Sequence, residues 1–363
     1  MRVICVAIIG GLVACGHHGA DPDASPADAP PWAPDAPLPD APPGTPDATP
    51  IDAGPPQTLL ETGLCANAAC DQINSGIYAF TPRWPLWSDG ATKKRWIYLP
   101  PGTQIDTSDM DWWHFPQGTK LWKEFTRDGI RVETRMYWKQ GATDDTWFQM
   151  AYVWNATQDD AVATPLGQMN ANGTQHDVPA RSDCRKCHDR NPQGGRILGF
   201  SALQLDVPAK PSEIALDDIV KMGWLSKPPA SNGSIGGPYF PLWPDRTPEA
   251  EAALGYMHAN CGQCHNEPSD VFQVCPRIFH LSVAELTSVH DTKTYITTIK
   301  QTPSITVANG TYVVAPGDPD HSALYIHFTG ANGAERMPPL ATEIIDPTGQ
   351  AALKAWIQQV PAN

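Results

Sequence analysis

Short β-favouring runs alternate with turn residues through the first half of the folded part of the chain. Aromatic and β-branched residues are frequent in these runs, and pairs such as Asp128-Gly129 separate them. The runs occupy residues 95–99, 120–125, 132–138 and 147–154. Regular short strands with turn signals between them predict an all-β domain over residues 58–174, built as an antiparallel β-sandwich.

The apolar positions change to a helical period in the second half. Thr247-Pro248 is typical of a helix start, and the helix should run directly to Cys261. Asp346-Pro347 has the same pattern and precedes the last apolar repeat. We therefore predict two mainly α domains, 175–245 and 246–363, after the β-sandwich. The expected fold class is multidomain.

The N-terminus has the pattern of an export signal. Arg2 precedes an apolar run within residues 1–14 that is too short to cross a membrane as a helix. The run ends in Leu-Val-Ala-Cys-Gly, which resembles the lipobox of bacterial lipoproteins. Cys15 is then the expected lipidation site, and an ordinary signal peptide cut nearby is the alternative. Both interpretations put the folded part outside the cytoplasm.

Residues 15–57 follow as a predicted disordered tether. Pro, Ala and Asp dominate this stretch, so it has too little apolar surface to fold. Seven aspartates in 21–52 account for half of the net charge of −14, and the folded part is only mildly acidic. This charge balance argues against nucleic acid as a partner. Farther along, Cys65 and Cys70 are close enough in sequence to form a small disulfide loop in an oxidising compartment.

The chain contains two copies of the motif Cys-x-x-Cys-His, which are its strongest indication of a cofactor. The first comprises Cys184, Cys187 and His188. The second comprises Cys261, Cys264 and His265. This motif attaches c-type haem, because two thiols on one helical turn can form thioethers with the vinyl groups and the histidine can then bind iron. We therefore expect two covalently attached haem c groups, with zinc sites or plain disulfides as the alternatives.

The last hundred or so residues resemble a class I cytochrome c domain. A helix runs into the second haem motif, and Arg336-Met337-Pro338-Pro339 precedes the closing helix. In that family the methionine at this place is an iron ligand. The resemblance therefore implies His265 as the proximal ligand and Met337 as the distal ligand of the second haem. Such ligation raises the reduction potential and favours electron transfer.

A wider resemblance covers most of the folded part. Segments such as Leu86-Trp87-Ser88-Asp89-Gly90-Ala91 and Phe115-Pro116-Gln117-Gly118-Thr119-Lys120 are similar to those of a family of exported bacterial di-haem cytochromes whose role is undefined. This resemblance implies the order of the domains and the two haems. It implies no substrate.

The sixth ligand of the first haem is left open by the sequence. His176 is the first choice, and Met169 and Met222 are alternatives. His258, on the helix that enters the second motif, could instead face the first haem. The question matters because a saturated iron passes electrons, whereas an open iron can bind peroxide or another small molecule.

The sequence therefore predicts a membrane-tethered, extracytoplasmic di-haem cytochrome that transfers electrons between redox partner proteins. It would be an electron carrier rather than an enzyme. The alternative is a di-haem peroxidase-like enzyme or another haem redox enzyme with an open first haem, although the chain has no recognisable distal acid/base motif. A third interpretation is a binding module whose β domain docks a partner.

Overall fold

The computed structural model describes residues 54–189, 197–230, 237–339 and 342–362. The predicted signal peptide, Cys15 and nearly all of the predicted tether lie outside the described residues. Residues Ala53–Asn363 form one compact unit. None of its described helices is long and apolar enough to cross a membrane.

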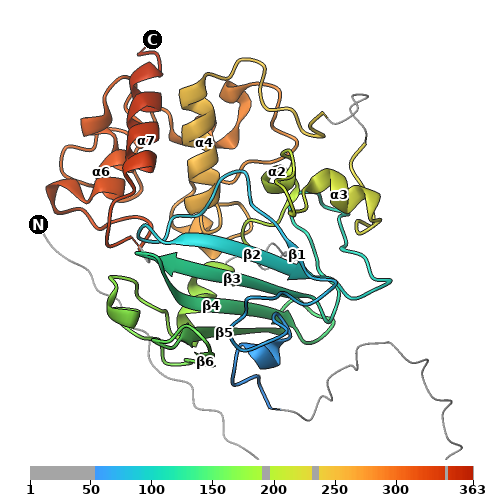
Figure 1. The fold of residues 1–363 in the computed structure, drawn as a ribbon. Coiled ribbons are helices and arrows are strands. Elements are labelled where there is room, and N and C mark those ends of the chain that lie inside the picture. Colours follow the sequence, from blue (N-terminus) through green and yellow to red (C-terminus); the bar gives the residue numbers. More distant parts are fainter. Residues whose placement is uncertain (1–53, 190–196, 231–236, 340–341, 363) are drawn as a thin grey trace, which may run out of the picture. The chain divides into compact units, whose positions relative to one another are not determined.

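A six-stranded antiparallel sheet forms the first half of this unit (Figure 1). The strands follow one another in the sheet in sequence order, so each pairs with the next along the chain. Asp128 and Gly129, both with positive φ, make the tight turn between the two longest neighbours, β3 and β4. The strands are β1 Tyr78–Ala79, β2 Thr92–Tyr98, β3 Lys120–Arg127, β4 Ile130–Lys139, β5 Trp147–Trp154 and β6 Ala161–Ala163.

The predicted β-sandwich is wrong, because the described strands form one sheet and not two. The alternating pattern located the strands but could not specify what covers each face. One face carries the row Trp96, Trp122, Met136 and Met150, and the segment that holds Leu59 packs over it. That segment includes the expected Cys65–Cys70 disulfide, which the structure contains.

The prediction of two mainly α domains is also wrong. The helices of the described second half are short and are joined by long irregular segments in which Pro and Gly, which disfavour helix interiors, are frequent. The α-helices are α1 Arg181–His188, α2 Ala202–Leu205, α3 Leu216–Lys221, α4 Pro248–Asn260, α5 Lys293–Thr298, α6 Ala323–Thr329 and α7 Pro347–Gln359. Single 3-10 turns lie at Leu60–Thr62, Ala171–Gly173, Asp270–Gln273, Val289–Asp291, Pro319–His321 and Ala331–Gly333.

The two longest helices, α4 and α7, begin where the sequence predicted. Thr247 accepts a hydrogen bond from the Ala250 N–H at 3.1 Å, and Asp346 accepts one from the Thr348 N–H at 2.9 Å. The helices pack closely because Gly349 of α7 has no side chain where Tyr256 of α4 approaches. Their buried residues form the core of the C-terminal part.

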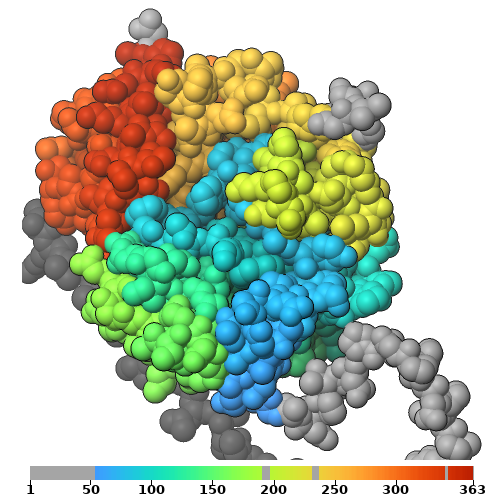
Figure 2. All heavy atoms as spheres, viewed as in Figure 1, coloured from blue at the N-terminus to red at the C-terminus, as the bar shows by residue number. Residues whose placement is uncertain are grey.

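The sheet and the C-terminal helices are joined by the segment that precedes β2. The Trp87 N–H donates to Asn260 Oδ1 at 2.7 Å, and the Trp87 indole donates to the Ile344 carbonyl at 3.1 Å. Trp84 packs so closely on α4 that a Cβ on Gly255 would lie 2.1 Å from the indole nitrogen. Figure 2 shows atoms of the early and late parts of the chain packed directly together on this face.

Gly255→Ala tests this close packing. The added methyl group has to displace the Trp84 ring, and overpacking of this kind costs about 1–3 kcal/mol. We expect a lower free energy of unfolding in urea and a looser contact between the sheet and α4. Ala252→Ser, on the exposed side of the same helix, should change stability by less than about 0.5 kcal/mol. Equal stability of both variants and the wild type would contradict the packing argument.

Asp144, in the turn between β4 and β5, forms an ion pair with a buried lysine. The Lys139 side chain is 1% exposed and its Nζ lies 2.5 Å from Asp144 Oδ1, and His114 also contacts this carboxylate. Burial acts to raise the pKa of Asp144, but Lys139 and His114 outweigh it and lower the pKa. The ionised carboxylate therefore makes its whole contribution to the free energy of unfolding above the unfolded pKa of about 3.9. This contribution is lost as the pH falls through the lower pKa of the folded state.

Asp144→Asn leaves Lys139 buried beside a neutral amide. We expect a loss of about 2 kcal/mol at pH 7, less than for a fully buried pair because the carboxylate is partly exposed. The variant should also lose less stability than the wild type when the pH is lowered below about 4. Asp145→Asn, at the exposed neighbouring position, is the control. Parallel curves of unfolding free energy against pH for D144N and wild type would be the contrary result.

Candidate functional site

The first Cys-x-x-Cys-His motif occupies the second half of α1. Cys184, Cys187 and His188 are half-buried, whereas Arg185 and Lys186 between them are exposed. This division follows from the helical period, which puts residues i, i+3 and i+4 on one face. Neither cysteine forms a disulfide among the described residues. The motif therefore presents two thiols and an imidazole on the side of α1 that faces the protein.

The sheet lies directly beneath this motif. The His188 ring contacts the Tyr137 ring of β4, with centroids 4.3 Å apart. Burial and the neighbouring Cys184 thiol raise the pKa of Tyr137 well above its ordinary value, so the phenol is neutral. Its hydroxyl is buried and has no hydrogen-bond partner among the described residues. A buried, unpaired hydroxyl is costly and fits a site that takes a further group.

The second motif follows the last turn of α4. The Cys261 N–H donates to the Met257 carbonyl at 2.8 Å, and the His265 N–H donates to the Cys261 carbonyl at 2.9 Å. The motif therefore begins as a continuation of the helix, as the sequence predicted. Cys261 and Cys264 likewise form no disulfide among the described residues.

His265 is held as a neutral imidazole. Burial lowers its pKa to about 4, and its ring packs edge-on against Phe279 with centroids 5.1 Å apart. Its Nδ1 is buried and has no hydrogen-bond partner among the described atoms. A neutral imidazole is the form that binds a metal. The residues present at this motif thus fit a histidine-ligated haem.

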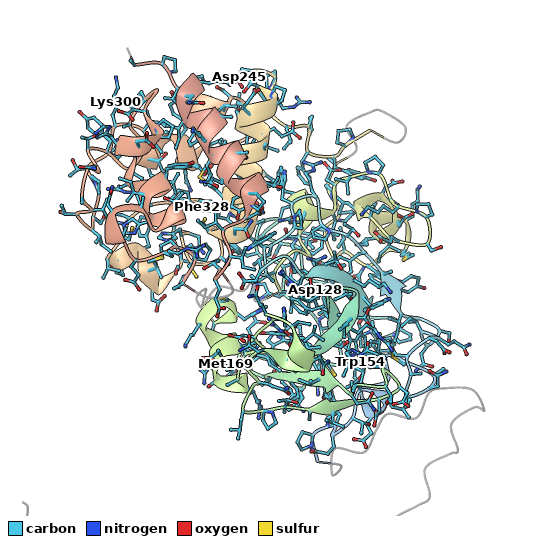
Figure 3. All side chains as sticks on the ribbon, turned by 60° about the vertical axis from the view of Figure 1, so that its left-hand side comes forward. Asp128, Trp154, Met169, Asp245, Lys300 and Phe328 are labelled. Atoms are coloured by element: carbon cyan, nitrogen blue, oxygen red, sulfur yellow. A yellow bond between two sulfur atoms is a disulfide. The ribbon has the colours of Figure 1, made fainter. Side chains whose placement is uncertain are left out.

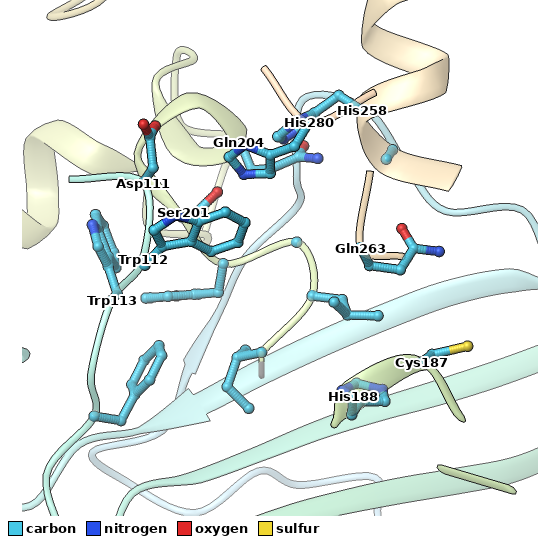
Figure 4. Close-up of a pocket in the computed structure, with 16 residues that line it drawn as sticks. Asp111, Trp112, Trp113, Cys187, His188, Ser201, Gln204, His258, Gln263 and His280 are labelled. Atoms are coloured by element: carbon cyan, nitrogen blue, oxygen red, sulfur yellow. The ribbon is translucent and has the colours of Figure 1, made fainter. Parts of the chain in front are cut away.

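One pocket is lined by both motifs (Figure 4). Cys187 and His188 of the first motif lie on one side, and Gln263 of the second motif lies across from them. His258 and His280 lie on the far side from His188. Segments distant in sequence therefore meet at a cavity that carries Cys187 and His188 of the first motif, Gln263 of the second and two further histidines. The cysteines and the histidine of the second motif do not line it.

His280 is a pocket residue that the sequence analysis missed. Asp111 fixes its segment, because its carboxylate accepts hydrogen bonds from the Ser282 hydroxyl at 2.5 Å and the Val283 N–H at 2.9 Å. Trp112 then stacks on the His280 ring with centroids 4.2 Å apart. A lone histidine in an irregular segment gives no signal in the sequence, so only the fold identifies it.

His258 holds the segment after His280 through a hydrogen bond. Its Nδ1 accepts a hydrogen bond from the Leu281 N–H at 3.0 Å, and burial lowers its pKa to about 4. The ring is therefore neutral and carries its proton on Nε2. In this tautomer neither nitrogen is free to bind iron, whereas no such bond engages the ring of His280 in the described contacts.

The other sequence-predicted ligands of the first haem lie elsewhere. His176 is 3% exposed, and its Nε2 lies 2.7 Å from Glu133 Oε1 on the sheet. Met169 is 70% exposed in a loop beside the sheet (Figure 3), and Met222 is 41% exposed after α3. None of the three lines the pocket that contains His188.

Met337 lies half-buried in the loop between α6 and α7. Its N–H donates to the His327 carbonyl at 3.0 Å, which ties the loop to the end of α6. It does not line the pocket between the motifs, as expected for a residue assigned to the second haem alone. Its pairing with His265 stays a prediction.

Among the described residues, no group of three or more His, Cys, Asp or Glu side chains is arranged to hold a metal ion. A structural zinc site needs such a group. A haem site does not, because the porphyrin supplies most of the iron ligands and the protein adds one or two.

Comparisons with protein-family models, with curated proteins and with solved structures found no match to this chain. The function is therefore inferred from the two motifs and from the geometry around them.

Proposed function

We propose that this protein is an extracytoplasmic di-haem c-type cytochrome that transfers electrons between redox partner proteins. The observation that carries the proposal is that Cys187 and His188 of the first motif and Gln263, between the cysteines of the second motif, line one pocket. Two haems held at these motifs would therefore lie near each other. An electron could then pass between them without leaving the protein.

The chain's own residues would hold the cofactors in distinct ways. Cys184, Cys187 and His188 offer their groups from one face of a helix that rests on the sheet. His265 offers a neutral imidazole from a half-buried position in the segment that follows α4. When bound, haem supplies reversible one-electron chemistry between ferric and ferrous iron. The protein supplies position, ligation and exclusion of water.

The lipobox-like segment supports a membrane anchor at Cys15, followed by the Pro-rich tether. A tether of this length would let the folded unit move near a bacterial membrane and meet redox partners there. The location would be the periplasm or the outer membrane surface.

The first test is the number of haems and their attachment. The full chain, co-produced with the c-haem attachment machinery, should contain two covalent haems by pyridine haemochrome assay and by mass. Cys184→Ser with Cys187→Ser should leave one, and Cys261→Ser with Cys264→Ser should leave the other. Cys275→Ser is the matched control and should retain both, because this free cysteine belongs to neither motif. A wild-type protein without covalent haem would refute the proposal.

We further propose His280 as the distal ligand of the first haem. It lies on the wall of the pocket away from His188, and Trp112 holds its ring. His280→Ala should convert one low-spin ferric signal to high-spin in low-temperature EPR, and that haem should then bind cyanide. His290→Ala, at an exposed histidine outside the pocket, should leave both signals unchanged.

The same spectra test the alternatives. If His176→Ala and not His280→Ala produces the high-spin signal, His176 is the ligand and the His280 assignment is wrong. If the wild type already contains one high-spin haem that reacts with peroxide, the protein is an enzyme of the di-haem peroxidase kind. For an electron carrier we expect two low-spin haems that neither bind cyanide nor react with peroxide.

A further inference from the structure

A row of three cationic side chains crosses the sheet beneath the first motif. In the register of β2, β3 and β4, Arg95 is opposite Lys123, and Lys123 is opposite Arg135. Paired residues of neighbouring strands point to the same face, so these three lie side by side. Like charges directly opposite one another destabilise a sheet. A bound anion would relieve the repulsion between these three cations.

A fourth cation adds to this charge. Lys93 lies opposite Phe125 in the adjoining row of the same face. The Phe125 ring has Arg135 Cζ at 4.3 Å from its centroid, Lys123 Nζ at 5.1 Å and Lys93 Nζ at 5.9 Å. The cations therefore converge on one ring. Its π face attracts them, but it carries no net charge to balance them.

The described part of the chain supplies only part of the balancing charge. Glu133 pairs with Arg135, whose Nε lies 2.8 Å from its carboxylate, and with His176. Glu213 lies near Arg95, and Asp89 and Asp346 lie near Lys93, whose ammonium donates to the Leu86 carbonyl at 2.7 Å. No carboxylate in the described residues forms an ion pair with Lys93, Arg95 or Lys123. Burial and neighbouring cations lower the pKa of Lys93 to about 7 and that of Lys123 well below its ordinary value. Burial lowers the pKa of Arg95 to about 10.

The row begins under the first motif. Arg135 lies close enough to Cys184 for their charges to interact, and Tyr137, the next residue on that face of β4, touches His188. Neighbouring strands are about 4.8 Å apart, so the row extends about 10 Å from β4 to β2. This length is close to the width of a porphyrin. A porphyrin joined to Cys184 and Cys187 could reach Lys123 and Arg95 with its opposite edge.

We infer that Arg95 and Lys123 bind the propionate carboxylates of the haem attached to Cys184 and Cys187. The inference rests on the proposed function, because it takes the haem as given. The ligand chemistry is a pair of carboxylates, and guanidinium and ammonium groups in a partly dry site bind carboxylates through charge-assisted hydrogen bonds.

The charge at this site controls the reduction potential of the first haem. A cation near the propionates offsets their negative charge and so favours ferrous over ferric iron. For two unit charges about 12 Å apart in an effective dielectric constant of about 20, removal of one changes an equilibrium constant by about tenfold. For a one-electron couple this is a fall of about 59 mV.

The test uses the full-length protein with both haems. Lys123→Gln and Arg95→Gln should each lower one of the two midpoint potentials by about this amount and leave the other unchanged. Both should also shift the propionate bending band of that haem in resonance Raman spectra. Lys94→Gln is the matched control: it removes the same charge from β2, but its side chain is 73% exposed and lies on the opposite face, beside Glu124.

Two outcomes would overturn the inference while the proposed function stands. The first is a two-haem protein in which neither K123Q nor R95Q changes a potential or the Raman band relative to K94Q. The second is a wild-type potential that shifts with added phosphate while K123Q and R95Q do not respond, which would mean that the row binds free anions. Absence of covalent haem in the wild type would instead reject the proposed function itself.

Discussion

The close packing of Trp84 and Trp87 on the end of α4 is the constraint on which the rest of the structure depends. Trp84 occupies the space left by Gly255, and the Trp87 N–H bonds to Asn260, the residue immediately before the second motif. These contacts join the segment leading into β2 to the helix that carries Cys261. Because α1 rests on the same sheet, the packing brings the two motifs to one pocket.

Charge is distributed unevenly around this pocket. His258 lines the pocket and His265 lies in the second motif, and burial keeps both neutral by lowering their pKa values to about 4. The sheet under the first motif holds a row of cations, of which Arg135 alone forms an ion pair with a carboxylate of the described residues, that of Glu133. A haem at each motif would therefore meet a different electrostatic environment. Such a difference sets two reduction potentials and gives electron flow a direction.

The sequence predicted local features well and their assembly poorly. Both long helices began at their Thr-Pro and Asp-Pro signals, and the four main strands lay near the alternating runs, because caps and alternation are local properties. The sandwich prediction failed because alternation says nothing about what covers a face. His280 and the cationic row were missed because tertiary packing and strand register create them, and Lys93, Arg95 and Lys123 look like ordinary surface residues in the sequence.

The most direct test of the central claim is pulsed dipolar EPR on the fully oxidised protein carrying both haems. Two ferric centres on the walls of one pocket should show a strong magnetic interaction, seen as faster relaxation of each signal in the presence of the other. The interaction should vanish in the variant that lacks the cysteines of one motif. Two haems that relax independently would contradict the account, because it places the two haems close together beside the pocket between the motifs.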